Sequence, residues 1–257
     1  MITLIAESKT MDDREVTVSP ETYEHHKPSG EAGAGEIMQR VAAMSAPEIA
    51  CLIKISIPMA AKVARMAYEF PNKLTGILAI ESFTGVVFRA FDYHGLSPEE
   101  KDRAGRNVRI ISSLYGWLRP DDIIKPYRFD FNTDIAPDDK ALSAFWRKDV
   151  TIELVKCLQA QGEKSILNLL PADASKCIDW KLVKRFAKVW KVDFKEPKDG
   201  SGWRTPHAGR LKTLRGELLR CIITQDISDP SMLLTLTTDN MIPLATPDYP
   251  DHIAFCV

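Results

Sequence analysis

Two arginines in the segment at residues 113–131, SLYGWLRPDDIIKPYRFDF, have the chemistry of an anion clamp. Arg119 and Arg128 each lie within two residues of a proline, and Tyr127 directly precedes the second arginine. A guanidinium presents a planar fork of donors that matches phosphate oxygens, and a tyrosine adds a ring face and a hydroxyl. The segment therefore predicts a rigid turn that holds Arg119, Tyr127 and Arg128 ready for a phosphate or a base.

A structural role is the alternative for the same segment. Arg119 would then form an ion pair inside the turn, with Asp121 or Asp122 as its partner. Tyr115 and Trp117 are better explained as core residues. For the two arginines both roles stay open.

A lysine and a threonine follow the opening apolar stretch, MITLI at residues 1–5. If that stretch is a strand with parallel neighbours, the loop after it lies where such sheets bind ligands. Lys9 and Thr10 would there offer a cation beside a hydroxyl, which suits an anion. An ordinary surface turn is the more common meaning of a lone Lys-Thr pair.

The stretch at residues 45–69 resembles a helix-hairpin-helix, in which turn amides and a helix N-terminus hold a DNA phosphate. Its cations would add positive charge: Lys54, Lys62 and Arg65. Such hairpins are usually glycine-rich, whereas this one reads SIP at 56–58, and Pro58 has no N–H to donate. Two antiparallel core helices explain the pattern equally well.

A helix at residues 208–225 carries a modest basic patch. Lys212 and Arg215 are three residues apart and therefore share a face. Solvated surface charge is the usual meaning of such a pair. Gly216 is less ordinary, because a glycine inside a helix costs about 1 kcal/mol relative to alanine and indicates a close backbone approach.

An enzyme is the second functional possibility, although the sequence has no P-loop, dinucleotide-binding fingerprint or G-x-S-x-G elbow. Lys9 could act as an amine nucleophile if burial and nearby cations lowered its pKa. Asp173 or Glu7 would be its proton-transfer partner, and Arg119 with Arg128 would clamp an anionic small molecule.

The whole-chain totals exclude several classes of protein. The formal net charge is -1, so any polyanion must be held by a local patch. Five scattered cysteines form no C-x-x-C pair, and the adjacent His25 and His26 lie in a polar stretch where solvated side chains are the usual finding. We therefore expect no metal and no cofactor. No stretch has the length of a signal-peptide core or of a membrane span, which predicts a cytoplasmic protein without a membrane partner.

The elements that must position these residues alternate between strands and helices. We expect a mobile loop at 19–35, with helical pattern only after Gly35, and extended segments at 76–81 and 83–88, of which the second could equally open a helix. Capping boxes and apolar periodicity predict helices at 45–55, 59–69, 98–106, 139–161 and 208–225. Strands are predicted at 1–5, 107–119, 165–170, 187–194 (exposed or at an edge) and 252–257, with an extended run at 127–131. The expected fold is a single α/β or α+β domain over 1–257, built around a mixed sheet.

Several motifs together resemble the YaaA family of peroxide-stress-resistance proteins. They are SKT at 8–10, LYGWLRPDDIIKPYR at 114–128, FW at 145–146, NL at 168–169 and RG at 215–216. The resemblance implies a cytosolic protein with a fold peculiar to the family, a positively charged cleft and a helix-hairpin-helix element. It also implies binding of duplex or branched DNA and a role in limiting peroxide damage, including by lowering free iron.

The family pattern also implies which side chains line the cleft. They are Lys9, Thr10, Arg119, Tyr127, Arg128, Asn168, Lys176 and Arg215. This sequence departs from the pattern at AESKT, where Glu7 stands two residues before Lys9, and at residues 129–132 and 170–174. We therefore expect a DNA-binding protein of peroxide defence, with an enzyme acting on a nucleotide, nucleobase or other anionic small molecule as the alternative. Direct iron binding has little support in the sequence.

Overall fold

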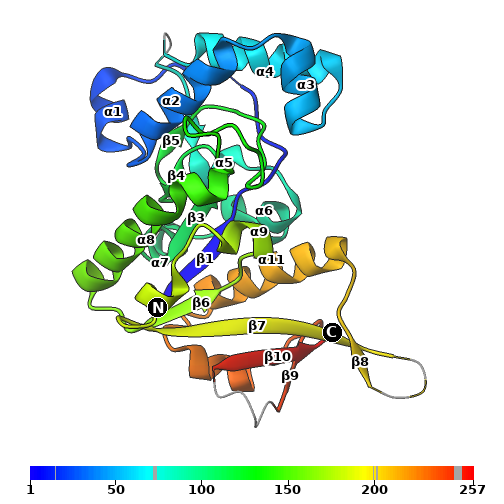
Figure 1. Ribbon diagram of the computed structural model, residues 1–257. Helices are drawn as coiled ribbons and strands as arrows, with labels where there is room; N and C mark the ends of the chain where they lie inside the picture. Colours follow the sequence, from blue (N-terminus) through cyan, green and yellow to red (C-terminus); the bar gives the residue numbers. More distant parts are fainter. Residues whose placement is uncertain (15, 72–73, 199, 201, 246–250) are drawn as a thin grey trace.

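The computed structural model describes residues 1–14, 16–71, 74–198, 200, 202–245 and 251–257, and is shown in Figure 1. Its core is a mixed α/β arrangement around an eight-stranded sheet with the order β4-β3-β1-β6-β7-β10-β9, with β8 paired to β7. The strands are β1 (Ile2–Ala6), β2 (Ile77–Leu78), β3 (Val108–Ser112), β4 (Gly116–Leu118), β5 (Ile123–Ile124), β6 (Ser165–Asn168), β7 (Lys188–Pro197), β8 (Trp203–Arg204), β9 (Ile242–Leu244) and β10 (His252–Cys256). The expected α/β or α+β fold class is therefore confirmed.

The interior strands run parallel to one another. β1 pairs in parallel with β3 and with β6, β6 with β7, and β7 with β10, whereas β4, β8 and β9 pair antiparallel. Ile2, Leu4 and Ile5 of β1 are at most 1% exposed, as expected for a strand covered on both faces. A second sheet consists of β2 and β5 alone.

Helices surround this sheet. They are α1 (Pro20–His25), α2 (Glu31–Ala42), α3 (Ala46–Ile53), α4 (Ile57–Glu69), α5 (Ala79–Ser82), α6 (Val86–Phe91), α7 (Pro98–Asn107), α8 (Leu142–Gln161), α9 (Ala172–Ser175), α10 (Trp180–Val183) and α11 (Ala208–Thr224), with 3-10 turns η1 (Tyr93–Gly95) and η2 (Pro230–Thr235). In Figure 1, α1 to α4 gather at one end of the molecule, and β7, β9 and β10 lie at the other. Within the described residues, no helix combines the length and hydropathy required to cross a bilayer.

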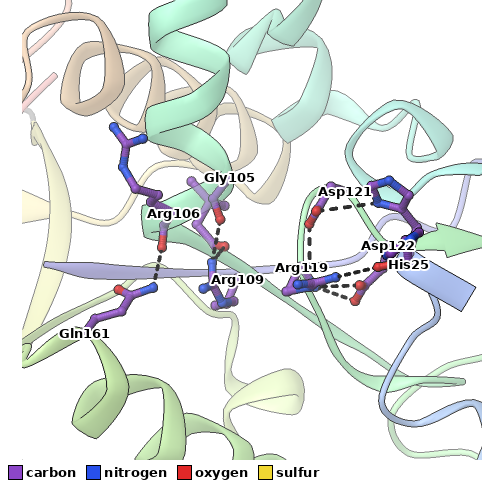
Figure 2. Close-up of polar contacts among 10 residues, drawn as sticks. His25, Gly105, Arg106, Arg109, Arg119, Asp121, Asp122 and Gln161 are labelled. Atoms are coloured by element: carbon purple, nitrogen blue, oxygen red, sulfur yellow. Dashed lines mark hydrogen bonds and ion pairs between the residues drawn. The ribbon is translucent and has the colours of Figure 1, made fainter. Parts of the chain in front are cut away.

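Local sequence signals account for the helix boundaries. Ser45 and Ser97 each form a complete capping box with the glutamate three residues later, and Gly162 ends α8 with a φ of 66°. Side chains from neighbouring elements donate hydrogen bonds to the free backbone carbonyls at the end of α7. Figure 2 shows Arg109 donating to the carbonyl of Gly105 at 2.9 Å, and Gln161 donating to that of Arg106 at 3.0 Å.

The close approach predicted at Gly216 is confirmed. A Cβ at Gly216 would lie 2.3 Å from the carbonyl oxygen of Val87, because α11 packs directly on α6. The amide of Gly85, directly before α6, donates at 3.0 Å to the Ser8 hydroxyl in the loop after β1, so α6 lies beside the end of β1. It therefore helps to shape the surface where Arg89 and Lys212 lie.

The loop predicted at 19–35 is wrong. Ser19 caps α1 by accepting from the amide of Thr22, and Pro20 and Glu21 complete a standard helix start. Tyr23 is buried, and α2 begins at Glu31 rather than after Gly35. Polar composition concealed α1, whose buried residue is Tyr23, and glycines at 30, 33 and 35 concealed the start of α2.

Three strand predictions need correction. The expected single strand at 107–119 is two antiparallel strands, β3 and β4, since Gly116 with a φ of 70° allows a tight turn between them. β7 is interior, with β6 on one side and β10 on the other, and not at an edge. Residues 76–81 begin as β2 but continue as α5. For residues 83–88 the helix alternative is confirmed, since α6 begins at Val86.

Candidate functional site

The candidate site lies where the strand order reverses. After β1 the chain enters β3 on one side of β1, and later it enters β6 on the other side. In parallel sheets this switch point, at the carboxyl ends of the strands, is the usual ligand crevice. The residue that directly follows β1 there is Glu7, and the one that follows β3 is Ser113.

A cavity of about 380 Å³ opens at this point. Its polar lining includes Glu7, Lys9, Thr10, Arg89, Asp130, Asp173 and Lys212. Apolar side chains complete the wall: Val86, Val87, Phe131 and Pro171. A concave, largely apolar space with a few convergent polar groups is the usual form of a small-molecule site.

Glu7 is held by a network of donors. The Ser113 amide donates to Oε2 at 2.8 Å, the Ser113 hydroxyl donates to Oε1 at 2.5 Å, and the Tyr127 hydroxyl donates to Oε2. Tyr127 in turn contacts the Ser112 hydroxyl at 2.7 Å. Tyr127 is 4% exposed, so its ring packs in the core while its hydroxyl reaches the site.

Burial raises the pKa of Glu7 from its usual 4.5 to about 7, although hydrogen bonds from Ser113 and Tyr127 act to lower it. Burial, together with the Glu7 charge, also raises the pKa of Tyr127 well above its ordinary value. Glu7 is therefore the group at this site that is suited to exchange a proton near neutral pH.

The same network reaches a tryptophan on the opposite side. Trp146 of α8 is 3% exposed, and its Nε1 donates to the carbonyl of Ser113 at 2.9 Å. Ser113 thus links the carboxyl group of Glu7 to the indole of Trp146 through a single residue.

Lys9 is an ion-paired and largely exposed cation. Its ammonium lies 2.5 Å from Oδ2 of Asp130, and its side chain is 58% exposed. Burial acts to raise the pKa of Asp130, but hydrogen bonds from Lys9 and Asn132 outweigh it, so the pKa is lowered. Arg128 donates to the backbone carbonyl of Lys9 and so fixes the loop after β1.

Several cations around the cavity have no carboxylate within ion-pair distance among the described residues. They are Arg89, Arg128, Lys176, Lys212 and Arg215. Arg89 donates to the carbonyl of Thr84 at 2.8 Å, and Lys176 to Oδ1 of Asn132 at 3.0 Å. Burial lowers the pKa of the Arg215 guanidinium, while the charge of Asp173 acts to raise it. The cavity lining itself holds three cations, Lys9, Arg89 and Lys212, and three carboxyl groups, Glu7, Asp130 and Asp173.

Arg119 does not line this cavity. Figure 2 shows it among Asp121, Asp122 and His25, and its Nε lies 3.1 Å from Oδ1 of Asp122. Burial raises the pKa of Asp122 to about 6 against the opposing effect of the Arg119 contacts. The structural role considered for Arg119 is therefore confirmed, and Tyr115 and Trp117 are core residues as expected.

The helix pair α3 and α4 lies apart from the cavity. Lys54 ends α3 in the left-handed conformation with a φ of 55°, and Ser56 precedes α4 without a side-chain cap. Lys62 is paired with Asp13 at 2.5 Å, and Arg65 is exposed. Lys62 and Arg65 line a different, smaller cavity.

The remaining predicted residues have modest roles. Thr10 is exposed at the cavity, and Asn168 at the end of β6 accepts from the amide of Leu170 at 3.0 Å. Sequence reasoning did not single out Arg89 or Ser113. Arg89 lies on α6, and Ser113 directly follows β3. A clear helical pattern at residues 86–91 would have been the sequence signal for Arg89, but this segment could be interpreted as a strand or as a helix. Within the described part of the chain, no group of three or more His, Cys, Asp or Glu residues is placed to hold a metal ion.

Comparisons with known proteins identify relatives over most of the chain. The family model described as "Peroxide stress protein YaaA" matches residues 1–241. A UPF0246 protein of Parabacteroides distasonis is 29% identical over 239 residues, covering 92% of each chain. A UPF0246 protein of Shewanella sp. (strain ANA-3) is 33% identical over 237 residues, covering 89% of this chain and 88% of the relative.

Proposed function

The chain belongs to the peroxide stress protein YaaA family, and from that membership we propose that it binds duplex or branched DNA in the cytoplasm as part of the peroxide response. The observation that carries the proposal is the group of cations at the carboxyl edge of the sheet that lack carboxylate partners among the described residues. Phosphate contacts from such cations supply most sequence-independent affinity for DNA. A local patch of this kind suffices even when the net charge is -1.

The helix pair α3 and α4 is proposed as a second DNA contact. The hairpin between them, at residues 54–56, is short, and Ile57 and Met59 at the start of α4 are 52% and 39% exposed. The amides at that helix start, together with Lys54, would face the DNA backbone. We propose that any effect on cellular iron is indirect.

The test measures binding of a labelled duplex and a labelled four-way junction by fluorescence anisotropy. We expect binding in low salt and a steep loss of affinity as salt is added, because phosphate contacts release counterions. Arg128→Ala should weaken binding several-fold and make the salt dependence shallower by about one counterion. Arg147→Ala, an exposed arginine on α8, is the matched control and should bind as the parent does.

Absent or salt-insensitive binding would refute the proposal. An equal loss for Arg128→Ala and Arg147→Ala would show that general charge, rather than this cavity mouth, attracts the DNA. Circular dichroism on both variants separates loss of binding from loss of folding.

A second candidate is favoured by Glu7. A carboxyl group with a pKa near 7 on the wall of a small cavity is an arrangement typical of acid-base enzymes and not required for binding DNA. Under this candidate the cavity acts on an anionic small molecule, and Glu7 rather than Asp173 exchanges the proton. Lys9 is already paired with Asp130, which makes it a poor amine nucleophile.

A further inference from the structure

The donor network around Glu7 fixes where its proton must lie. The hydroxyl oxygen of Ser112 accepts from the amides of Leu114 at 3.1 Å and Tyr115 at 2.9 Å, which fills both of its lone pairs. Its own hydrogen is then donated to the oxygen of Tyr127, and the hydrogen of Tyr127 is donated to Glu7.

Both oxygens of Glu7 therefore face donors from the protein. Oε2 accepts from the Ser113 amide and from Tyr127, whereas the Ser113 hydroxyl donates to Oε1. The Ser112 hydroxyl, which also contacts Tyr127, acts on the Glu7 carboxyl from the same side as Tyr127. A carboxyl oxygen has two acceptor positions, so the open one belongs to Oε1. When Glu7 is protonated, its hydrogen lies on Oε1 and is available to a molecule in the cavity, since Glu7 lines it.

The cavity wall complements an aromatic ring that carries an anion. Val86, Val87 and Phe131 provide apolar surface, and Arg89 and Lys212 provide positive charge on the same cavity. Its volume of about 380 Å³ falls within the usual range for small-molecule sites. Apolar walls, one acidic hydrogen, and two cations without a carboxylate partner among the described residues suit a heterocyclic base with an acceptor atom and a single phosphate. On the same wall Lys9 and Asp130 pair with each other, and Asp173 adds a negative charge.

We propose that this cavity binds a nucleoside monophosphate, with the protonated Glu7 donating a hydrogen bond to the base and with Arg89 and Lys212 binding the phosphate. The inference rests on the second candidate function, a small-molecule site, and not on DNA binding. It assigns Glu7 a binding role that couples ligand affinity to pH.

Other titratable and charged groups surround Glu7. They are Lys9, Arg89, Tyr127, Asp130, Asp173, Cys177 and Lys212. Burial raises the pKa of both Tyr127 and Cys177, so both stay neutral near pH 7. The ligand phosphate loses its second proton at about pH 6, so between pH 7 and pH 9 it stays dianionic. Over that interval Glu7 is the group whose proton controls binding.

The test is isothermal titration calorimetry with AMP, GMP, CMP and UMP, and with inorganic phosphate as an anion without a base. At least one nucleotide should bind more tightly than phosphate, and its affinity should fall by more than about tenfold from pH 7 to pH 9 as Glu7 loses its proton. Titrations in buffers of different ionisation enthalpy should show proton uptake on binding at pH 8.

Glu7→Gln is the discriminating variant. A glutamine oxygen can accept from the Ser113 amide and Tyr127, and its amide can donate both to the Ser113 hydroxyl and into the cavity. The variant therefore resembles the protonated glutamate at every pH. We expect it to bind the nucleotide within a few-fold of the parent at pH 7, to lose the pH dependence, and to bind more tightly than the parent at pH 9.

A matched pair of lysine variants tests whether positive charge at the proposed phosphate position contributes to binding. Lys212→Ala should weaken nucleotide binding about tenfold, whereas Lys181→Ala, an exposed lysine on α10, should not change it. The proposal is overturned if no nucleotide binds, if phosphate binds as tightly as the nucleotides, or if Glu7→Gln keeps the pH dependence of the parent. Loss of DNA binding alone refutes the DNA proposal and leaves the nucleotide result standing.

Discussion

At the scale of single residues, Glu7 combines a place on the cavity wall with a cost to the folded state. Burial disfavours its charged form, and the donors from Ser113 and Tyr127 only partly offset that effect. The sequence indicated an acidic residue in the loop after the first strand. The sequence could not indicate the pKa of Glu7, because its hydrogen-bond donors, Ser113 and Tyr127, are more than a hundred positions away along the chain.

The folded-state pKa of about 7, against 4.5 for an exposed glutamate, has a defined consequence for stability. The contribution of Glu7 to the free energy of unfolding is fully present below pH 4.5 and is lost as pH rises through 7. Glu7→Gln should therefore match the parent at pH 4 and be more stable at pH 8, by up to about 3 kcal/mol. Urea denaturation at the two pH values measures the difference, and an equal difference at both would contradict the assigned pKa.

At the scale of elements, local capping signals identified α3 and α7, and apolar periodicity identified α8 and α11. Sequence reasoning failed where tertiary contacts decide the structure. The glycines around α2 indicated a loop, yet a Cβ at Gly33 would lie 2.6 Å from the Trp146 ring, so the glycine serves close packing of the helix.

Two glycines inside helices, one in close contact and one in open space, allow a paired test of packing. Gly216→Ala should lower the free energy of unfolding by about 1–3 kcal/mol, because the new methyl group would overlap the Val87 carbonyl. Gly105→Ala in α7 adds the same methyl where no atom lies within 4 Å, and should raise stability by about 0.5–1 kcal/mol. Chemical denaturation of the two variants beside the parent tests this, and a similar change in both would contradict the close approach of α11 to α6.

At the scale of the whole molecule, alternation of strands and helices predicted the fold class but not the strand order. Nothing local in the sequence shows that β6 pairs with β1, or that β7 is interior. That strand order brings residues 7, 113 and 173 to one edge of the sheet. It therefore determines which residues line the candidate site. It also explains why Arg119, prominent in the sequence, lies elsewhere in a turn with its own carboxylates.

The hydrogen bond from Trp146 to the carbonyl of Ser113 gives the protein an intrinsic optical reporter. Indole emission responds to nearby charge, and the residue whose carbonyl binds this indole also donates twice to Glu7. Unlabelled protein should therefore show a change in emission wavelength with a midpoint near pH 7. The change should vanish in Trp146→Phe and in Glu7→Gln. Its persistence in Glu7→Gln would place the titrating group elsewhere, and its persistence in Trp146→Phe would show that another of the five tryptophans reports it.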